Sequence, residues 1–341
     1  TWNGSELTNG RCTATISRNG DLVHRMYLEI TEETGAFAVP NPGAHYIDNV
    51  ELEIGGQKID KHSGQWLETW AELTETNPTA TVCTTAGAGT LFQKMSGMGG
   101  VPTALAGGQH IFVPLQFWFC RNPGLALPLI ALQYHEVKVI LNQLGTVISN
   151  GGSGGVSSSK LWCDYIYLDT DERRRFAQVS HEYLIEQVQE QSGQAQATND
   201  LNFNHPVKEL IWTGAWGSGA NADGPVLTSG NPTWMVKLNG HDRFAARDYR
   251  YFTRTQVWEH HSGAGGVTQT AGSGQFNDSI AVYSFALKPE EHQPSGTCNF
   301  SRIDNAQLIS NGGTPEALTI FAVNYNVLRI MSGMGGLAYS N

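Results

Sequence analysis

The chain has 341 residues and a mass of 37.1 kDa, which allows about two domains. Lys and Arg number 21 and Asp and Glu 31, so the net charge is −10, and only 15% of the residues are charged, against about 25% in an average soluble protein. With 40% hydrophobic residues, this composition excludes an intrinsically disordered chain, and the acidic balance argues against direct binding of nucleic acid. The longest apolar run, residues 111–120, is too short for a membrane-spanning helix.

The hydrophobic pattern has a period of two, which predicts half-buried antiparallel strands. Val50, Leu52 and Ile54, for example, alternate with polar neighbours. In chain order, alternation or a β-branched and aromatic composition predicts strands at residues 25–30, 49–54, 161–168, 234–239, 279–287 and 318–330. The only segment that favours a helical turn is 169–178, and no long amphipathic helix is expected.

Turn-forming dipeptides are dense, with six Asn-Gly and four Asn-Pro pairs. Four stretches rich in Gly, Ser, Thr and Ala are too long for ordinary β connections, and we expect them to be long loops: 76–108, 142–158, 214–232 and 259–278. The hexapeptide MSGMGG occurs at 95–100 and again at 331–336, in places that do not correspond, and we interpret this repetition as chance.

A longer repeat indicates an internal duplication. Residues 50–70 resemble residues 234–258, since each has an alternating strand, a Gly turn, a second strand and an aromatic segment. Residues 161–170 likewise resemble 319–330. The sequence therefore predicts two copies of one β architecture. We expect a first domain at 1–172, a connecting turn at 173–182 and a second domain at 183–341.

The size of each half favours an eight-stranded jelly roll over an immunoglobulin domain, which is shorter and often has a Cys…Trp…Cys core. Long runs then point to a family: 50–70, 113–139, 301–308 and the C-terminal 321–341 resemble the major capsid proteins of nucleo-cytoplasmic large DNA viruses, of the chlorella-virus and iridovirus type. The resemblance covers most of the chain. It implies a double jelly roll, with three chains forming a pseudo-hexagonal capsomer.

Three short patterns could suggest catalysis or metal binding. Residues 151–155 match GxSxG, but no helix pattern follows, so a loop is the better interpretation. Glu259-His260-His261 and Glu290-Glu291-His292 have no metal-ligand spacing, and we interpret both as solvated loop residues. We expect no catalytic residue, no metal and no cofactor.

Three further groups favour structural roles. The pairs Glu51/Glu53 and Asp169/Asp171 are interpreted as water-facing carboxylates, although a carbohydrate-cleaving pair is kept as an alternative. The basic run 173–175 is interpreted as a solvated or salt-bridged turn with the neighbouring acids, the alternative being contact at the domain junction, with an internal membrane or with a minor capsid protein. Six aromatic residues are expected in the core rather than on a sugar-binding platform: Trp66, Trp70, Phe117, Trp118, Phe119 and Trp162.

The sequence contains three N-x-S/T sequons and five cysteines. We expect no signal peptide, so the sequons at Asn3, Asn277 and Asn299 are weak glycosylation candidates, with Asn277 in a Gly-rich loop preferred and Asn299 more structural. The odd number and wide spacing of the cysteines predict reduced thiols.

The sequence thus predicts a structural, non-enzymatic major capsid protein of a large double-stranded DNA virus, located in the virion and assembled in the cytoplasm of the host cell. Its expected partners are two further copies in a homotrimer, neighbouring capsomers, minor capsid proteins and an internal membrane, and no nucleic acid. The alternatives are a minor capsid protein of the same fold and a two-domain jelly roll that binds or hydrolyses carbohydrate.

Overall fold

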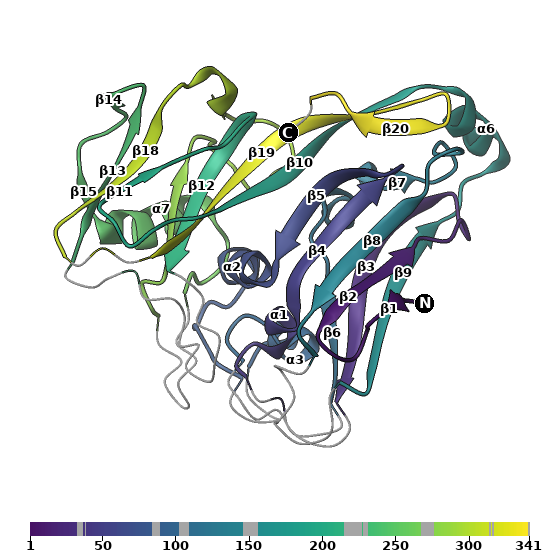
Figure 1. Cartoon of the computed structure of the whole chain (residues 1–341), viewed down its shortest axis with the longest axis horizontal. Coiled ribbons are helices and arrows are strands. Elements are labelled where there is room, and N and C mark those ends of the chain that lie inside the picture. Colours follow the sequence, from purple (N-terminus) through teal and green to yellow (C-terminus); the bar gives the residue numbers. More distant parts are fainter. Residues whose placement is uncertain are drawn as a thin grey trace. The chain divides into compact units, whose positions relative to one another are not determined.

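A computed structural model describes residues 1–32, 37, 39–83, 89–101, 109–145, 156–214, 227, 231–266, 276–313, 315 and 317–339 (Figure 1). The strands are β1 (Asn3–Gly4), β2 (Gly10–Thr15), β3 (Leu22–Glu32), β4 (Ile47–Ile54), β5 (Gln57–Ser63), β6 (Gln109–Pro114), β7 (Leu127–Pro128), β8 (Val137–Gln143), β9 (Ser158–Ile166), β10 (His181–Ser192), β11 (Thr198–Asp200), β12 (Pro206–Gly214), β13 (Thr233–Leu238), β14 (His241–Asp242), β15 (Arg247–Asp248), β16 (Ile280–Ser284), β17 (Cys298–Asn299), β18 (Ala306–Asn311), β19 (Leu318–Met331) and β20 (Met334–Leu337). The helices are α1 (Pro42–His45), α2 (Gly64–Thr74), α3 (Leu91–Ser96), α4 (Trp118–Arg121), α6 (Thr170–Gln178) and α7 (Gln256–His260), with 3₁₀ turns η1 (Pro123–Leu125) and η3 (Phe300–Arg302) and a π turn η2 (Tyr251–Thr255).

The chain divides into two compact units whose boundaries do not follow the order of the sequence. Unit 1 comprises residues 1–67, 91–187 and 326–341, and unit 2 comprises residues 68–90 and 188–325. Each unit therefore contains a segment from the other half of the chain. Residues 68–90 come from the N-terminal half, and 326–341 come from the C-terminal half.

Unit 1 contains two antiparallel sheets. One has the strand order β1-β2-β8-β4-β5, and in the other β3 pairs with β6, β7 and β9. The predicted alternation at 50–54 is confirmed, because Val50, Leu52 and Ile54 of β4 are fully buried while the residues between them are partly exposed. The chain crosses repeatedly between the two sheets, from β2 to β3, back to β4, and again from β7 to β8 and β9, as in a jelly roll.

Unit 2 repeats this topology. The order β11-β18-β13-β14 corresponds to β2-β8-β4-β5, and β12 pairs with β16 and β19 as β3 pairs with β6 and β9. The duplication predicted from the sequence is therefore confirmed, including the correspondence of the β4–β5 hairpin with β13–β14 and of β9 with β19. The fold is all-β, a double jelly roll, and the count of eight strands in each barrel stays a prediction.

The core of unit 2 lies between its two sheets. Trp212 of β12 packs edge-to-face on Trp234 of β13, with ring centroids 5.2 Å apart, and Phe252 of η2 contacts both rings. Residues of β16, β18 and β19 complete this buried cluster. Burial of several large rings in one layer is the main stabilising contribution of such a sheet pair.

Three two-residue turns close hairpins, and two of them were predicted from the sequence. Gly55 and Gly56 have φ of 58° and 84° between β4 and β5, and Asn239 and Gly240 have φ of 50° and 78° between β13 and β14. Positive φ at both positions matches the twist of the strands. The second MSGMGG copy supplies the β19–β20 turn at Ser332 and Gly333, whereas the first copy ends α3, so the two copies have different roles.

The expectation of no long amphipathic helix is wrong for residues 64–74. They form α2, an 11-residue helix that buries Trp66, Leu67, Trp70 and Leu73. The three- and four-residue spacing of these side chains matches a helix rather than a strand. The helical turn predicted at 169–178 is confirmed as α6, which takes its N-cap from Asp169.

The four predicted long loops lie partly outside the described residues, and residues 151–155 with the GxSxG pattern lie wholly outside them. The first of these stretches contains helix α3 in its described part, and the fourth begins with the end of α7.

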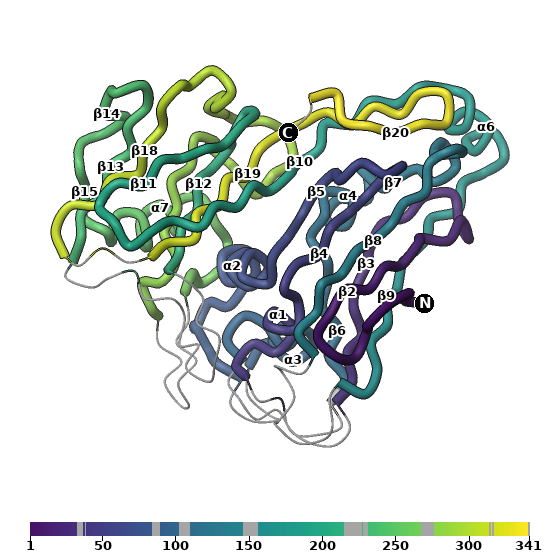
Figure 2. Tube along the Cα trace, viewed as in Figure 1, coloured from purple at the N-terminus to yellow at the C-terminus, as the bar shows by residue number. Residues whose placement is uncertain are grey.

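Residues 326–333 follow β10 and reach the end of α6, as the yellow trace in Figure 2 shows. Within unit 1, their turn is tied to the loop before β8. The amide of Tyr134 donates to the carbonyl of Gly333 at 3.0 Å, and the ring of His135 lies 3.1 Å from the amide of Gly335. A side chain at Gly333 would meet the Tyr134 ring at 2.6 Å, so glycine permits this close approach.

Candidate functional site

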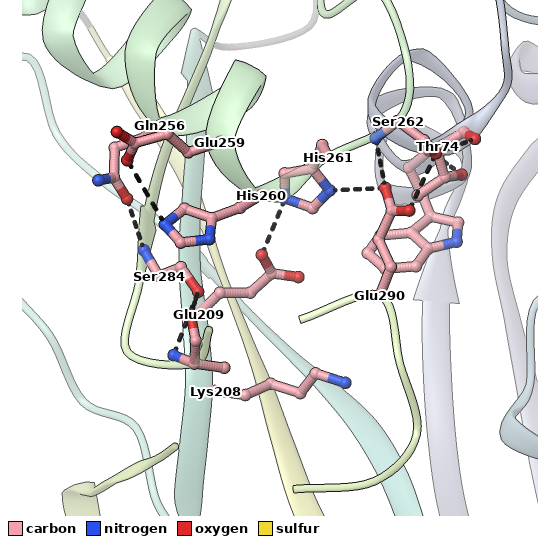
Figure 3. Close-up of polar contacts among 12 residues, drawn as sticks. Thr74, Lys208, Glu209, Gln256, Glu259, His260, His261, Ser262, Ser284 and Glu290 are labelled. Carbon is pink, nitrogen blue, oxygen red and sulfur yellow. Dashed lines mark hydrogen bonds and ion pairs between the residues drawn. The ribbon is translucent and has the colours of Figure 1, made fainter. Parts of the chain in front are cut away.

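A buried histidine lies between two glutamates in unit 2 (Figure 3). His261 follows α7, and its Nε2 lies 2.9 Å from Oε2 of Glu209 on β12, while its Nδ1 lies 3.1 Å from Oε1 of Glu290. The side chains of His261 and Glu209 have no exposed surface, and that of Glu290 is 28% exposed. We call Glu209, His261, Ser262 and Glu290 the histidine clasp.

The charges of this cluster fix its protonation. Burial alone would lower the pKa of His261, but the charge and hydrogen bond of Glu209, with those of Glu290, raise this pKa to about 9. Burial opposes ionisation of Glu290, yet the hydrogen bonds from His261 and Ser262 outweigh it and hold the pKa of Glu290 below its usual value. At neutral pH the clasp is therefore an imidazolium that donates to two carboxylates.

The histidine clasp holds the C-terminal end of α2. The amides of Gly263 and Gly265 donate to the carbonyls of Leu73 and Glu72 at 2.7 and 2.9 Å. The Ser262 hydroxyl lies 3.0 Å from the Thr74 carbonyl and 2.9 Å from Glu290 Oε2, and donates to one of them at a time. These contacts satisfy last-turn carbonyls that have no partner inside the helix.

The geometry of the clasp suits fastening rather than catalysis. Both ring nitrogens of His261 are bound to carboxylates, so neither is available as a general base, and the Ser262 hydroxyl bonds to Glu290 instead of the ring. The edge of Trp70 packs against the imidazole, with centroids 6.2 Å apart. The interpretation of His261 as a solvated loop residue is therefore wrong, because β12 brings Glu209 beneath it.

A second polar cluster, which we call the amide clasp, lies in unit 1. The Gln187 side chain of β10 donates to the carbonyl of Ile59 on β5, and its Oε1 accepts from Nδ2 of Asn326 at 2.9 Å. Asn326 also donates to the carbonyl of Tyr339 at 3.0 Å and accepts from the amide of Val327 at 2.7 Å. Gln187 and Asn326 are both buried, so neutral amides hold the C-terminal segment in unit 1.

The sequons lie in different environments. Asn3 is exposed on β1. Asn277 is half-buried, and the Ser279 of its sequon is buried. The side chain of Asn299 caps η3 by accepting from the Ser301 amide at 3.1 Å, which fits the structural role expected for it.

The other predicted charged residues lie on the surface. Glu51 and Glu53 are on the outer face of β4, where Glu51 lies 3.8 Å from Lys61. Arg173 pairs with Asp21 at 2.9 Å rather than with the adjacent acids, and Arg174 and Arg175 are exposed on α6. The basic run is therefore a solvated helix with one ion pair.

Five of the six aromatic residues predicted in the core are buried: Trp66, Trp70, Phe117, Trp118 and Phe119. The sixth prediction is wrong. Trp162 is 47% exposed on β9, and its Nε1 donates to Glu29 at 2.6 Å. Trp162 lies on the exposed face of β9, and the alternation alone does not show which face of a strand is covered.

Several large apolar side chains are exposed and were not predicted as contact residues. In unit 2, Trp258 of α7 is 82% exposed and Leu287 is 76% exposed, and the ring of His260 lies 3.3 Å from the Leu287 carbonyl. In unit 1, Tyr134 and Tyr167 are 76% and 72% exposed. A tryptophan so exposed is unusual in an isolated soluble protein and typical of a contact surface.

The described part of the chain contains no group of three or more His, Cys, Asp or Glu residues that could hold a metal ion. It contains no helix that is long and apolar enough to span a membrane. All five cysteines are free thiols, as predicted, and burial raises the pKa of Cys12, Cys120 and Cys163 to about 12.

The shared strand order of the two units places the protein in the double jelly-roll class. Two family models match the chain: "Major capsid protein N-terminus" at residues 1–169 and "Large eukaryotic DNA virus major capsid protein" at residues 172–336. Together they cover nearly the whole sequence. The chain belongs to the family of large eukaryotic DNA virus major capsid proteins.

Individual relatives support the same family. The major capsid protein of Pyramimonas orientalis virus is 49% identical, over 100% of this chain and 89% of that protein, and that of Paramecium bursaria Chlorella virus 1 is 39% identical, over 100% and 90%. A chain of the PBCV-1 virus capsid superposes with a TM-score of 0.82 at 35% identity, covering 100% of this chain and 95% of that one. The Faustovirus major capsid protein shares the fold, with a TM-score of 0.69 at 14% identity. The protein is a structural component of a virion capsid.

Proposed function

We propose that three copies of this chain form a pseudo-hexagonal capsomer, and that capsomers pack side by side into an icosahedral shell. The observation that carries the proposal is the shared strand order of the two units. Two similar barrels in each chain give six similar barrels in a ring of three chains, which approximates a hexagon. We further propose that the ancestral halves are residues 1–172 and 183–341, joined through 173–182.

Self-association without catalysis is consistent with the surface of the described residues. Obligate interfaces bury at least about 2,000 Å² and have an apolar centre, with Trp and Tyr as frequent anchors. Trp258 and Leu287 of unit 2 supply such anchors, as do Tyr134 and Tyr167 of unit 1. The low content of charged residues, 15%, limits repulsion between identical neighbours.

Further partners in this proposal are neighbouring capsomers, minor capsid proteins and an internal membrane. Among the glycosylation candidates, Asn3 is the most accessible. Asn3 is exposed, whereas Asn277 and Asn299 are engaged in local structure. Intact-mass analysis of virion protein would detect a glycan, and mapping of the modified peptide would assign it.

The test is the native mass of the purified full chain by light scattering, followed by negative-stain electron microscopy. We expect a particle of three times 37.1 kDa with a hexagonal outline. Replacing Trp258 with Ser should raise the dissociation constant of the trimer at least tenfold, and the neighbouring Glu259→Gln variant should leave it unchanged. A stable monomer that binds an oligosaccharide with defined stoichiometry would overturn the proposal.

A further inference from the structure

The end of α2 is the point at which the N-terminal half of the chain contributes to unit 2. Its last-turn carbonyls accept from residues 262–265, which follow His261 directly. A side chain at Gly263 would meet the carbonyl oxygen of Glu72 at 2.4 Å, so this segment lies against the helix with no spare room. The position of residues 262–265 therefore depends on what holds His261.

Carboxylates surround the imidazole. Glu209 faces it from β12, and Glu290 faces it from the loop after β16. Glu75 lies beyond the end of α2, and its pKa is raised first by burial and then by the nearby charge of Glu290. From α7, the neighbouring His260 lies 3.9 Å from Glu259.

Two other charged groups lie on the packed elements. Lys208 of β12 directs its Nζ to the carbonyl of Glu291 at 3.2 Å. On α2 itself, burial and the adjacent Glu68 raise the pKa of Glu72 well above its usual value. The imidazolium of His261 is thus a positive charge that contacts both Glu209 and Glu290 directly.

Loss of one proton changes the bonding of the whole cluster. A neutral imidazole has one N–H, so it can donate to only one of the two carboxylates. The other carboxylate then faces a lone pair, and if it is Glu209 it remains fully buried and loses the hydrogen bond from the imidazole. An unpaired buried charge is strongly destabilising.

We propose that the histidine clasp is a charge-dependent latch that holds the end of α2 in unit 2 and releases it when His261 loses its proton. The amide clasp of unit 1 has no titrating group among its bonds between Ile59, Gln187 and Asn326, so it does not respond to alkali. An alkaline shift loosens one fastening and leaves the other closed.

The direction of the pH dependence follows from the raised pKa of His261. Its contribution is complete below the ordinary value of 6.5, declines as the unfolded histidine deprotonates, and is lost as the pH passes about 9. The lowered pKa of Glu290 sets the acidic limit, because its contribution is present above the ordinary value of 4.5 and is lost below it. The latch is therefore strongest between the ordinary pKa of Glu290, 4.5, and the ordinary pKa of His261, 6.5.

Hydrogen exchange of the full chain, read by mass spectrometry and corrected for intrinsic rates, tests the latch. Between pH 6 and pH 9, protection of peptides covering residues 70–75 should fall more than tenfold, while peptides covering 326–330 should change less than twofold. The His261→Gln variant should lack protection at residues 70–75 already at pH 6 and show no further fall. The matched His260→Gln variant should behave like the unmodified protein.

Two outcomes would overturn the proposal. One is protection of residues 70–75 that does not change with pH in the unmodified chain. The other is a fall of the same size in His261→Gln, which would assign the effect to another group such as Glu72. If His261→Gln does not fold, Glu290→Gln serves instead, since this side chain is 28% exposed, and it should reduce the fall at least threefold. An unchanged fall in that variant contradicts the latch equally.

Discussion

The two clasps solve the same structural problem with different chemistry. In unit 1, a segment from the C-terminal half is held by the neutral side chains of Gln187 and Asn326. In unit 2, a segment from the N-terminal half is held by an imidazolium between two carboxylates. Neutral amides lose only hydrogen bonds when one is removed, whereas removal of one ion leaves its partner charged and buried. One fold can therefore combine a pH-independent fastening with a titratable one.

The largest effect is expected for His261→Ala. This change leaves the fully buried Glu209 without the imidazolium that pairs with it, so the free energy of unfolding at pH 6.5 should fall by about 3–5 kcal/mol. Urea denaturation followed by tryptophan fluorescence measures it. His260→Ala should cost less than about 1 kcal/mol, because this neighbour has no buried ion pair. Equal losses in the two variants would remove the distinction between the histidine clasp and its surroundings.

A steric change should act on the same fastening without altering its charges. Gly263→Ala places a methyl group 2.4 Å from the Glu72 carbonyl oxygen and should cost about 3 kcal/mol at every pH. Gly124→Ala is the matched control, since its methyl group would meet only the Asn122 side chain at 3.2 Å. Thermal unfolding of both variants at pH 6 and pH 9 separates the constant steric cost from the pH-dependent one.

The amide clasp should give a smaller and flat response. Asn326→Ala leaves the Val327 amide and the Tyr339 carbonyl without this partner, which should lower the free energy of unfolding by about 2 kcal/mol. The loss should be the same at pH 6 and pH 9, because no bonded group titrates. A loss that grows with pH would show that the amide clasp is not independent of pH.

The smallest effect is a gain. Burial and the charge of Glu68 raise the pKa of Glu72, so its ionisation at pH 8 opposes folding. Glu72→Gln should therefore raise stability by about 1 kcal/mol at pH 8, with the gain vanishing near pH 4, where the unmodified carboxyl keeps its proton in both states. Differential scanning calorimetry at the two pH values would detect the change, and a loss at pH 8 would contradict it.

The sequence predicted the repeated β topology because alternation and turn chemistry are local. Val50, Leu52 and Ile54 are spaced for a strand, and Gly55-Gly56 and Asn239-Gly240 are spaced for hairpins. Helix α2 was missed although Trp66, Trp70 and Leu73 show helical spacing, because this part of the repeat was interpreted only as an aromatic segment after the second strand.

The clasps depend on contacts that sequence spacing does not reveal. Glu209 lies 52 positions and Glu290 29 positions from His261, and only the packing of α7 against the sheet brings them together. A signal was present in the sequence, since Lys208-Glu209 interrupts an otherwise apolar central strand. Charged residues at such a place require partners, but the sequence does not say which ones.

The exchange of segments between the halves also fixes when the protein can fold. Residues 326–341 belong to unit 1, so this unit cannot be completed until that segment has been synthesised. Chains under synthesis expose incomplete barrels, and such intermediates are prone to aggregate. This order delays the completion of unit 1 until most of the second half has been made, so a chain that stops before residue 326 would lack part of its first unit.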